Sequence, residues 1–370
     1  MTELNRCREC VLPVTTPGLD LDEDGVCNYC REHEPFPLRG EEALLEALED
    51  ARAEGAAYDC EIIISGGRDS SYALWLLAEH YGLRVLAVHY DNPFAHPQAY
   101  ANVKRATDRL DVPLVVVGDR EDVHVRCFRN NVRAFFRRPR PAMISMMCLG
   151  CKNILRYGAE VAREHGAPLI VTASTPYEQL PFKKALQGVP LGASHLRLYA
   201  SRFWTGLTEL ALNPGYLTHD TLAQTARTFA NLDIFSPAVP FLYPDVRFLC
   251  IFYYLRWDEP TVLRTVREEL GWSKPEETDS PWRFDCRIGP LKDFLYRRML
   301  GLTEKESFYS VLIREGIIGR EDALERLARE REPTPEELDE CLRPAGLSLK
   351  ELMEANPRLW EGAGEAVSNS

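Results

Sequence analysis

The chain has 370 residues, of which 45% are hydrophobic and 27% are charged, and its formal net charge is −12 at pH 7. This length and apolar content allow a large core, so we expect a central domain with appendages rather than a disordered chain. The pI of about 5.3 argues against a broad surface for binding nucleic acid. The sequence has no apolar run of about 18 residues and opens with no charged-then-apolar leader, so we expect a cytoplasmic protein without a membrane partner.

Eleven cysteines in a chain without a secretory leader indicate metal binding or catalysis rather than disulfides. Cys7 and Cys10 form one Cys-x-x-Cys pair, and Cys27 and Cys30 form a second. The stretch between the pairs is too short and too polar to hold a core of its own. Two such pairs predict a tetrahedral thiolate site for structural zinc, with iron as the alternative, in a ribbon or knuckle over residues 1–36.

A helix rich in Ala, Leu and Glu over 41–54 leads into a strand-loop-helix pattern. An apolar strand over 61–64 is followed by a glycine-containing loop and then by helical apolar spacing over 72–81. Adjacent glycines let backbone N–H groups converge on an anion, and the helix N-terminus adds partial positive charge. The pattern predicts a phosphate-binding turn, with an ordinary glycine turn as the alternative. The expected ligand-binding residues are Ser65, Gly66, Gly67, Arg68, Asp69, Ser70 and Ser71.

The hexapeptide Ser-Gly-Gly-Arg-Asp-Ser, from Ser65 to Ser70, resembles the SGGxDS motif of the PP-loop ATP pyrophosphatases. The lysine-bearing P-loop consensus does not occur in the sequence. The resemblance implies that the chain binds ATP and Mg²⁺, adenylates a substrate and releases pyrophosphate, with Asp69 helping to position the metal and the phosphates. Arg68 stands where many relatives have lysine, and it would bind phosphate as a planar fork rather than as a point charge.

A second predicted strand, over 85–89, ends at the polar sequence His-Tyr-Asp-Asn. Ligands of doubly wound sheets lie outside the carboxyl ends of the strands, so His89, Asp91 and Asn92 are predicted nucleotide contacts, with a polar turn as the alternative. PP-loop relatives have a similar Asp-Asn beside the adenosine. Further strands near residues 114 and 169, separated by helical patterns, predict an α/β fold with a parallel, doubly wound sheet, HUP-like as in PP-loop ATPases, over 37–185.

The segment Arg129–Pro141 is strongly basic and contains two phenylalanines. It could contact nucleic acid or a phosphorylated substrate, or it could be the solvated face of a helix.

A second cysteine pair, Cys148 and Cys151, precedes a helix over 153–165 and a strand over 169–172. This stretch resembles the Cys-x-x-Cys, Arg-Tyr and Glu-x-Gly region of the iron-sulfur-dependent tRNA 2-thiolation enzymes, which are PP-loop proteins with a third cysteine far downstream. Cys286 is the best third candidate. The resemblance implies a [4Fe-4S] cluster on these three cysteines, with one iron open for sulfur. The alternatives are a second zinc site, a redox pair or structural cysteines.

The two ends of the chain carry another resemblance. The opening Cys-x-x-Cys, Thr-x-Pro-Gly and Asp-Glu-x-Gly-Val-Cys-x-x-Cys, together with 313–327, resemble the bacterial N-acetyl sugar amidotransferases. These are PP-loop enzymes of surface-polysaccharide synthesis, and the resemblance implies ammonia supplied by a partner glutaminase.

The remaining predictions concern the second half of the chain. Lys183 follows a predicted core strand and could offset developing phosphate charge, although a solvated loop is equally expected there. Residues 186–330 are predicted to form a helical region over the nucleotide site. Residues 331–370 are predicted to form two short helices, starting at Thr334 and Ser348, and a mobile tail.

Together these patterns predict an ATP pyrophosphatase that adenylates a carbonyl or amide oxygen and replaces it with sulfur. Asp69, Lys183 and the three cysteines of the second set would be its catalytic residues. The alternative is amidation of an N-acetyl sugar. The expected partners are a small-molecule or tRNA acceptor and a sulfur donor or glutaminase, and a homodimer is allowed. A non-catalytic nucleotide-binding or redox-sensing protein is the rival class, whereas a Ser/His/Asp hydrolase is disfavoured because no Gly-x-Ser-x-Gly elbow occurs.

Overall fold

The computed structural model describes residues 5–53, 55–118, 122–190, 192–230 and 239–360. Five parallel strands form one sheet in the order β3-β2-β1-β4-β5. Because the chain proceeds outward from β1 in one direction and then returns to its other side, the sheet is doubly wound, with its switch point between β1 and β4. The strands are β1 (Cys60–Ile63), β2 (Val85–Tyr90), β3 (Leu114–Val117), β4 (Leu169–Thr172) and β5 (Arg247–Cys250).

The predicted α/β class and parallel sheet are confirmed, and the four expected strands are all present. The fifth strand, β5, was not anticipated from the sequence. It pairs with β4, in register from Leu169 with Arg247 to Thr172 with Cys250. Cys250 is buried at the end of this strand.

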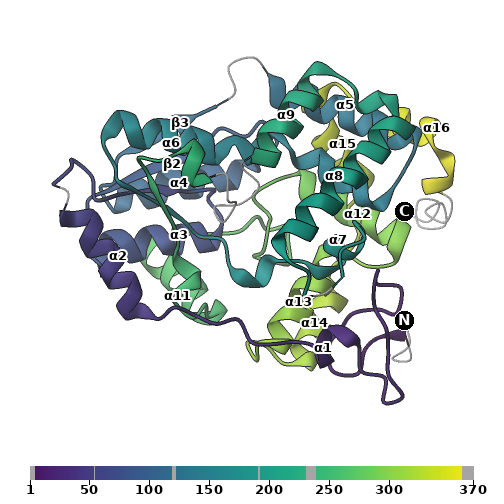
Figure 1. Cartoon of the computed structure of the whole chain (residues 1–370), viewed down its shortest axis with the longest axis horizontal. Helices are drawn as coiled ribbons and strands as arrows, with labels where there is room; N and C mark the ends of the chain where they lie inside the picture. The colour runs from purple at the N-terminus through teal and green to yellow at the C-terminus, as the bar shows by residue number, and fades with distance from the viewer. Residues whose placement is uncertain (1–4, 54, 119–121, 191, 231–238, 361–370) are drawn as a thin grey trace.

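Helices cover both faces of the sheet, and β2 is accordingly buried along its whole length. On one face, α3 (Arg68–Trp75) packs against α4 (Pro97–Arg109) and α11 (Glu259–Leu270). The helix α2 (Glu41–Ala53) lies close to α11 on the same side of the sheet (Figure 1). On the other face, α6 (Ile154–His165) packs on β1, β2 and β4. The carboxyl ends of the strands, where a ligand is predicted to bind, are therefore followed by loops and are not covered by these helices.

The other helices form a layer beside the sheet (Figure 1). Thr334 and Ser348 cap two short helices near the end of the chain, which confirms the predicted starts. The predicted mobile tail over 361–370 lies outside the described residues. The elements of this layer and its connections are α5 (Val123–Arg137), η3 (Pro141–Cys148), η4 (Gly150–Asn153), α7 (Pro181–Ala185), α8 (His195–Leu212), α9 (His219–Ala230), α10 (Val239–Leu242), α12 (Ile288–Leu300), α13 (Glu304–Arg314), α14 (Arg320–Arg329), α15 (Pro335–Leu342) and α16 (Leu349–Ala355).

The amino-terminal segment, which contains α1 (Asn28–Arg31), packs against α13 and α14 (Figure 1). The backbone N–H of Val11 donates to Ser310 Oγ at 3.2 Å, and Arg320 Nε donates to the carbonyl of Cys10 at 3.1 Å. The two ends of the chain therefore form one unit, while the linker after α1 runs along the molecule to α2.

Among the helices of the described residues, none is long and apolar enough to cross a membrane.

Candidate functional site

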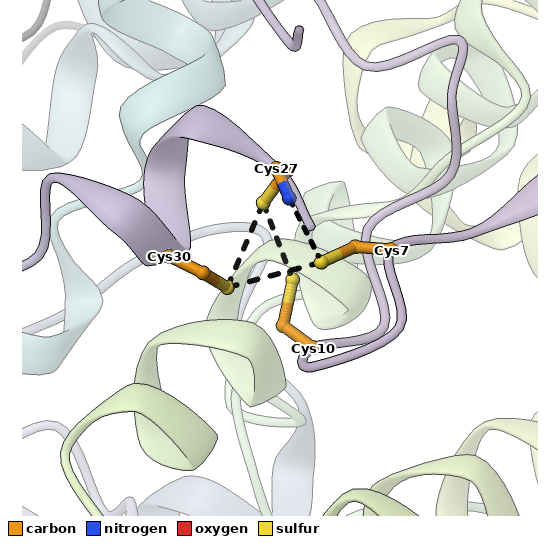
Figure 2. Close-up of side chains that lie close together, drawn as sticks. All are labelled: Cys7, Cys10, Cys27 and Cys30. Carbon is orange, nitrogen blue, oxygen red and sulfur yellow. Dashed lines mark hydrogen bonds between the residues drawn. The ribbon is translucent and has the colours of Figure 1, made fainter. Parts of the chain in front are cut away.

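The four amino-terminal cysteines converge on one point (Figure 2), as predicted. Their sulfur atoms all lie within 4.8 Å of one another. Cys7 and Cys30 have their sulfurs 3.9 Å apart, Cys10 and Cys27 3.8 Å apart, and Cys27 and Cys30 3.6 Å apart. Ligands placed about 2.3 Å from a tetrahedral zinc ion are about 3.8 Å apart, so the four sulfurs fit a single ion such as zinc.

This four-cysteine site has the features of a structural site. Cys7, Cys10 and Cys27 are completely buried, and the backbone N–H of Cys27 donates to Cys7 Sγ at 3.3 Å. Mutual hydrogen bonds lower the pKa values of Cys7 and Cys10, the second to about 7, and raise those of Cys27 and Cys30, so the four thiols titrate as one interacting group. Thiolates are the ligand form, and all four positions are filled by protein, which leaves none for a substrate.

The predicted phosphate-binding turn lies between β1 and α3, at the carboxyl end of the central strand. Gly66 has φ +84°, and a Cβ there would lie 2.0 Å from the carbonyl oxygen of Ala99, so only glycine fits. Trp272 Nε1 and Asn102 Nδ2 both donate to the Gly66 carbonyl, at 3.0 and 3.2 Å. Gly67 is the N-cap of α3. The turn is thus fixed by its neighbours and directs the first N–H groups of a helix outward, which suits an anion.

Asp69 lies in the first turn of α3 and is mostly buried. Trp257 Nε1 donates to its Oδ1 at 2.8 Å. Burial raises the pKa of this carboxyl above its ordinary value, although the neighbouring Arg68 opposes the rise. The carboxylate is therefore held in one orientation beside the turn.

The side chain of Arg68 is directed into the protein. It is 1% exposed, forms an ion pair with Glu259 and stacks over Trp257, with its Cζ 4.9 Å from the ring centroid. Glu259 also binds Arg326 of α14. These contacts connect α3 with α11 and α14, and the phosphate-fork role of Arg68 stays a prediction.

The polar residues after β2 have different surroundings. His89 is buried, and its Nδ1 lies 2.9 Å from the Ile64 carbonyl oxygen, so it links the ends of β2 and β1. Burial lowers the pKa of His89, which favours the neutral ring. The backbone N–H of Asp91 donates to Val117. Asn92 Nδ2 lies 3.6 Å from Cys286 Sγ, so the strand end predicted to contact the nucleotide also contacts the third cysteine. Nucleotide contacts by these side chains remain a prediction.

The segment that carries Cys286 packs on the loop after β2. Ala95 and Cys286 form an isolated antiparallel bridge, the N–H of His96 donates to the Asp285 carbonyl at 3.0 Å, and the N–H of Arg287 donates to Phe94 at 2.9 Å. Backbone pairing therefore fixes the position of the cysteine next to the turn.

Cys148 and Cys151 lie on η3 and η4, and η3 packs against α12, which begins just after Cys286. Burial raises the pKa of Cys286, and the negative charges of Cys148 and Cys151 raise it further. The structure thus places the three predicted cysteines close enough for their charges to interact. Within the described part of the chain, however, only the amino-terminal set has sulfurs converging within 4.8 Å. Ligands of one zinc ion would converge in that way, whereas the ligands of a cluster bind different irons and stand further apart.

Asp285 is a candidate site residue that the sequence analysis missed. Its carboxylate lies beside the turn, because a Cβ at Gly67 would lie 4.0 Å from its Oδ2 and 3.3 Å from Ser65 Oγ. Burial raises the pKa of Asp285. Its only signal in the sequence was its position next to Cys286. Because Asp285 lies beside the turn and directly precedes Cys286 in the chain, it places the second cysteine set near the turn.

Three cations surround the carboxylate of Glu304 at the start of α13. Lys183 Nζ and Arg283 Nη1 each lie 2.5 Å from it, and Lys292 Nζ lies 3.1 Å away. Burial opposes the charged form, but these cations hold the pKa of Glu304 well below its ordinary value. Lys292 also interacts with Cys148, whose negative charge raises the pKa of the amine against the effect of burial. Lys183, Arg283 and Lys292 therefore form a group of three cations around Glu304, called the positive cluster below, and Arg283 also pairs with Glu178 at 3.6 Å.

The basic segment predicted near residue 130 has mostly internal partners. Its arginines extend from α5 to neighbouring helices, and their acceptors are carboxylates and one backbone carbonyl. This arrangement supports a packing role for the segment over a free nucleic-acid surface. The pairs are Arg129 with the Ala345 carbonyl, Arg133 with Glu351, and Arg138 and Arg140 with Glu209.

No model of a protein family matches the chain. An uncharacterized protein of Methanocaldococcus jannaschii is 29% identical over 116 residues, which are 30% of this chain. The chain spans less than half of that curated relative, because the match covers 42% of its length. Among solved structures, a U34-tRNA thiolase from Methanococcus maripaludis with its [4Fe-4S] cluster is 14% identical, with 90% of both chains covered and a TM-score of 0.32.

Proposed function

We propose that this chain is an ATP pyrophosphatase that adenylates an oxygen atom of its acceptor and replaces that oxygen with sulfur. One observation carries the proposal. Asp285 lies beside the phosphate-binding turn, with its Oδ2 4.0 Å from the position of a Cβ at Gly67, and the next residue, Cys286, directly precedes α12, which packs against the segment η3 that carries Cys148. A nucleotide site and a three-thiol site therefore share one short segment.

ATP would bind with its phosphates at the turn and the N-terminus of α3. Backbone N–H groups of this turn are the donors, and Asp69 would hold Mg²⁺ against the phosphates. Attack of the acceptor oxygen on the α-phosphorus forms an adenylated acceptor and releases pyrophosphate. A sulfur nucleophile then displaces AMP. Lys183, in the positive cluster around Glu304, would offset the charge that develops on the phosphates.

The three-thiol site fits an iron-sulfur cluster better than a single zinc ion. Its sulfurs do not converge as those of the amino-terminal set do. A cluster with three protein ligands supplies one iron that can bind sulfur for transfer. The first cysteine set would hold zinc and would have only a structural role.

A small molecule is the preferred acceptor in this proposal. The chain is acidic, and the arginines of the basic segment described above are occupied by internal partners. A tRNA acceptor would need a positive surface that follows its backbone.

The test uses anaerobically purified protein. Iron, zinc, labile sulfide and the visible spectrum are measured on the wild type and on Cys148→Ala, and pyrophosphate release is measured on the wild type and on Asp69→Asn. We expect about four irons per chain and broad visible absorption, both lost in Cys148→Ala. Pyrophosphate release should fall at least about a hundredfold in Asp69→Asn.

The two halves of the proposal fail separately. Protein that contains zinc alone would remove the sulfur chemistry, and ammonia-dependent amidation of N-acetyl sugars would be assayed next. Undiminished pyrophosphate release by Asp69→Asn would refute the assignment of the turn.

A further inference from the structure

We propose that the outer face of α8 is the contact surface for a second copy of this chain, with the two α8 helices packed antiparallel about a twofold axis. The helix lies in the layer beside the sheet (Figure 1). It contributes no residue to the phosphate-binding turn or to either cysteine set. The inference therefore goes beyond the proposed function and does not depend on it.

The polar side chains of α8 face the protein. Glu209 is buried and forms ion pairs with Arg138 at 3.7 Å and with Arg140 at 3.3 Å. One turn and a half earlier, Arg202 Nε donates to the side chain of Gln187 at 3.0 Å. A surface helix of a monomer has the reverse arrangement, with its apolar side inward and its charges outward. These contacts hold the polar side of α8 against the protein and direct the other side outward.

An apolar stripe runs along the outward side of α8. Its members recur three or four positions apart, which places them on one face of the helix. The large members are Leu196, Phe203, Trp204 and Leu207, which are 79%, 55%, 64% and 47% exposed, and the small members are the exposed Ala200 and Ala211. A continuous apolar stripe of this kind on a surface marks an interaction site.

The order of the side chains along the stripe identifies a second α8 as the partner. Two helices that pack antiparallel about an axis between Phe203 and Trp204 bring these aromatic residues together at the centre. On either side of the centre, Leu196 faces Ala211 and Ala200 faces Leu207. Each large side chain outside the centre therefore meets a small one, which is the condition for close packing of facing helices. The stripe is complementary to itself.

Charge also favours contact at this face. The chain has a net charge of −12, so two copies repel each other over much of their surfaces. The sequence of α8 contains one carboxylate, which is the inward-facing Glu209. Arg197 lies beside the stripe near one end of the helix, and in an antiparallel pair the two copies of Arg197 lie at opposite ends. Two copies can therefore meet along α8 without opposing like charges.

The exposed apolar area is sufficient for a specific interface. Large apolar side chains bury about 150–250 Å² each when they are fully covered, so the four large members offer roughly 500 Å² per copy. Two copies would bury about 1,000 Å² from these side chains alone, which is near the lower limit for a specific interface. We therefore expect a dimer whose population depends on the protein concentration.

Dimerisation is measured by sedimentation velocity on the full chain with its bound metals, from about 1 to 100 µM. We expect the wild type to show a monomer–dimer equilibrium. Trp204→Glu should weaken it at least about a hundredfold, because it places a charge in both central contacts. Phe241→Glu is the matched control and should dimerise like the wild type, since Phe241 is an exposed aromatic residue of α10 that lies outside the stripe.

The antiparallel register is tested by two further variants. Ala200→Glu and Leu207→Arg should each be monomeric alone, because the new charge faces an apolar residue of the other copy. A mixture of the two should form a heterodimer, since the new carboxylate and guanidinium face each other while the unchanged leucine and alanine meet across the axis. All of these positions are exposed, so the variants should keep the wild-type melting temperature, which separates loss of the dimer from loss of the fold.

The inference is overturned if the wild type stays monomeric at the highest concentration, if Trp204→Glu dimerises like the wild type, or if the mixed variants stay monomeric. A monomer that binds vesicles of phosphatidylcholine and phosphatidylglycerol through the stripe would also overturn it, and would assign the stripe to a membrane surface. Asp69→Asn and Cys148→Ala should dimerise like the wild type. Failure of the proposed function therefore leaves this result unaffected.

Discussion

The two cysteine sets of this molecule are assembled in different ways. The first consists of two Cys-x-x-Cys pairs within one short segment, residues 7–30, which supplies all four of the converging sulfurs. The second takes Cys148 and Cys151 from one segment and Cys286 from another, and it depends on the packing of η3 against α12 and on the bridge between Ala95 and Cys286. A site encoded locally can be predicted with its geometry, whereas a site assembled by tertiary packing can be predicted only as a set of candidates.

The largest effect that we expect is a selective loss of metal: a substitution in either cysteine set should remove the metal of that set and leave the metal of the other. Cys27→Ser should lose zinc and much of its thermal stability while keeping iron, because the metal is linked to the folding of the knuckle. Cys286→Ala should lose iron while keeping zinc. Both metals are measured on the same anaerobic samples, together with the melting temperature.

Cys127→Ala is the matched control, since Cys127 is buried in α5 and belongs to neither set. It should keep both metals. If Cys27→Ser retained its zinc, the four-cysteine site would be refuted. If Cys286→Ala retained its iron, the second set would need a different third ligand.

Much of the molecule could be predicted from the sequence, and the exceptions share one cause. The sheet strands near residues 61, 85, 114 and 169, the turn and the knuckle depend on apolar spacing and short motifs. The partner of Arg68 could not be predicted, because Glu259 comes close only when α11 packs on α3. Asp285 was missed for the same reason. Its position beside Gly67 brings together residues far apart in the chain, and no local pattern encodes that proximity.

Asp285 provides a smaller test of how the two regions are coupled. Its carboxylate occupies a position beside the turn where phosphate oxygens would come, so Asp285→Asn should remove a repulsion. We expect ATP to bind about five- to tenfold more tightly in the absence of Mg²⁺, measured by calorimetry. Asp279→Asn, a change at an exposed aspartate in the segment before it, is the control and should have no effect. Weaker binding in Asp285→Asn would instead indicate that the carboxylate helps to hold ATP.

The smallest effect concerns the pH dependence of the positive cluster. Burial lowers the pKa of Lys183 to about 8, although Glu304 lies 2.5 Å from its Nζ. The amine is charged below this pH and neutral above it. If Lys183 offsets phosphate charge, pyrophosphate release should decline as the pH rises through about 8, and Lys183→Arg should move the decline to higher pH because a guanidinium stays protonated.

The lowered pKa of Lys183 also distinguishes this loss of activity from a loss of activity caused by unfolding. Because the folded state binds the Lys183 proton more weakly than the unfolded state does, the contribution of this group to stability rises with pH above about 8. Activity should therefore fall in a pH range in which the titration of Lys183 does not promote unfolding. The melting temperature, measured at the same pH values, checks this. Lys104→Arg, on the exposed face of α4, should leave the decline in place. An unchanged profile in Lys183→Arg would assign the decline to another group, with the thiols of the second cysteine set as the next candidates.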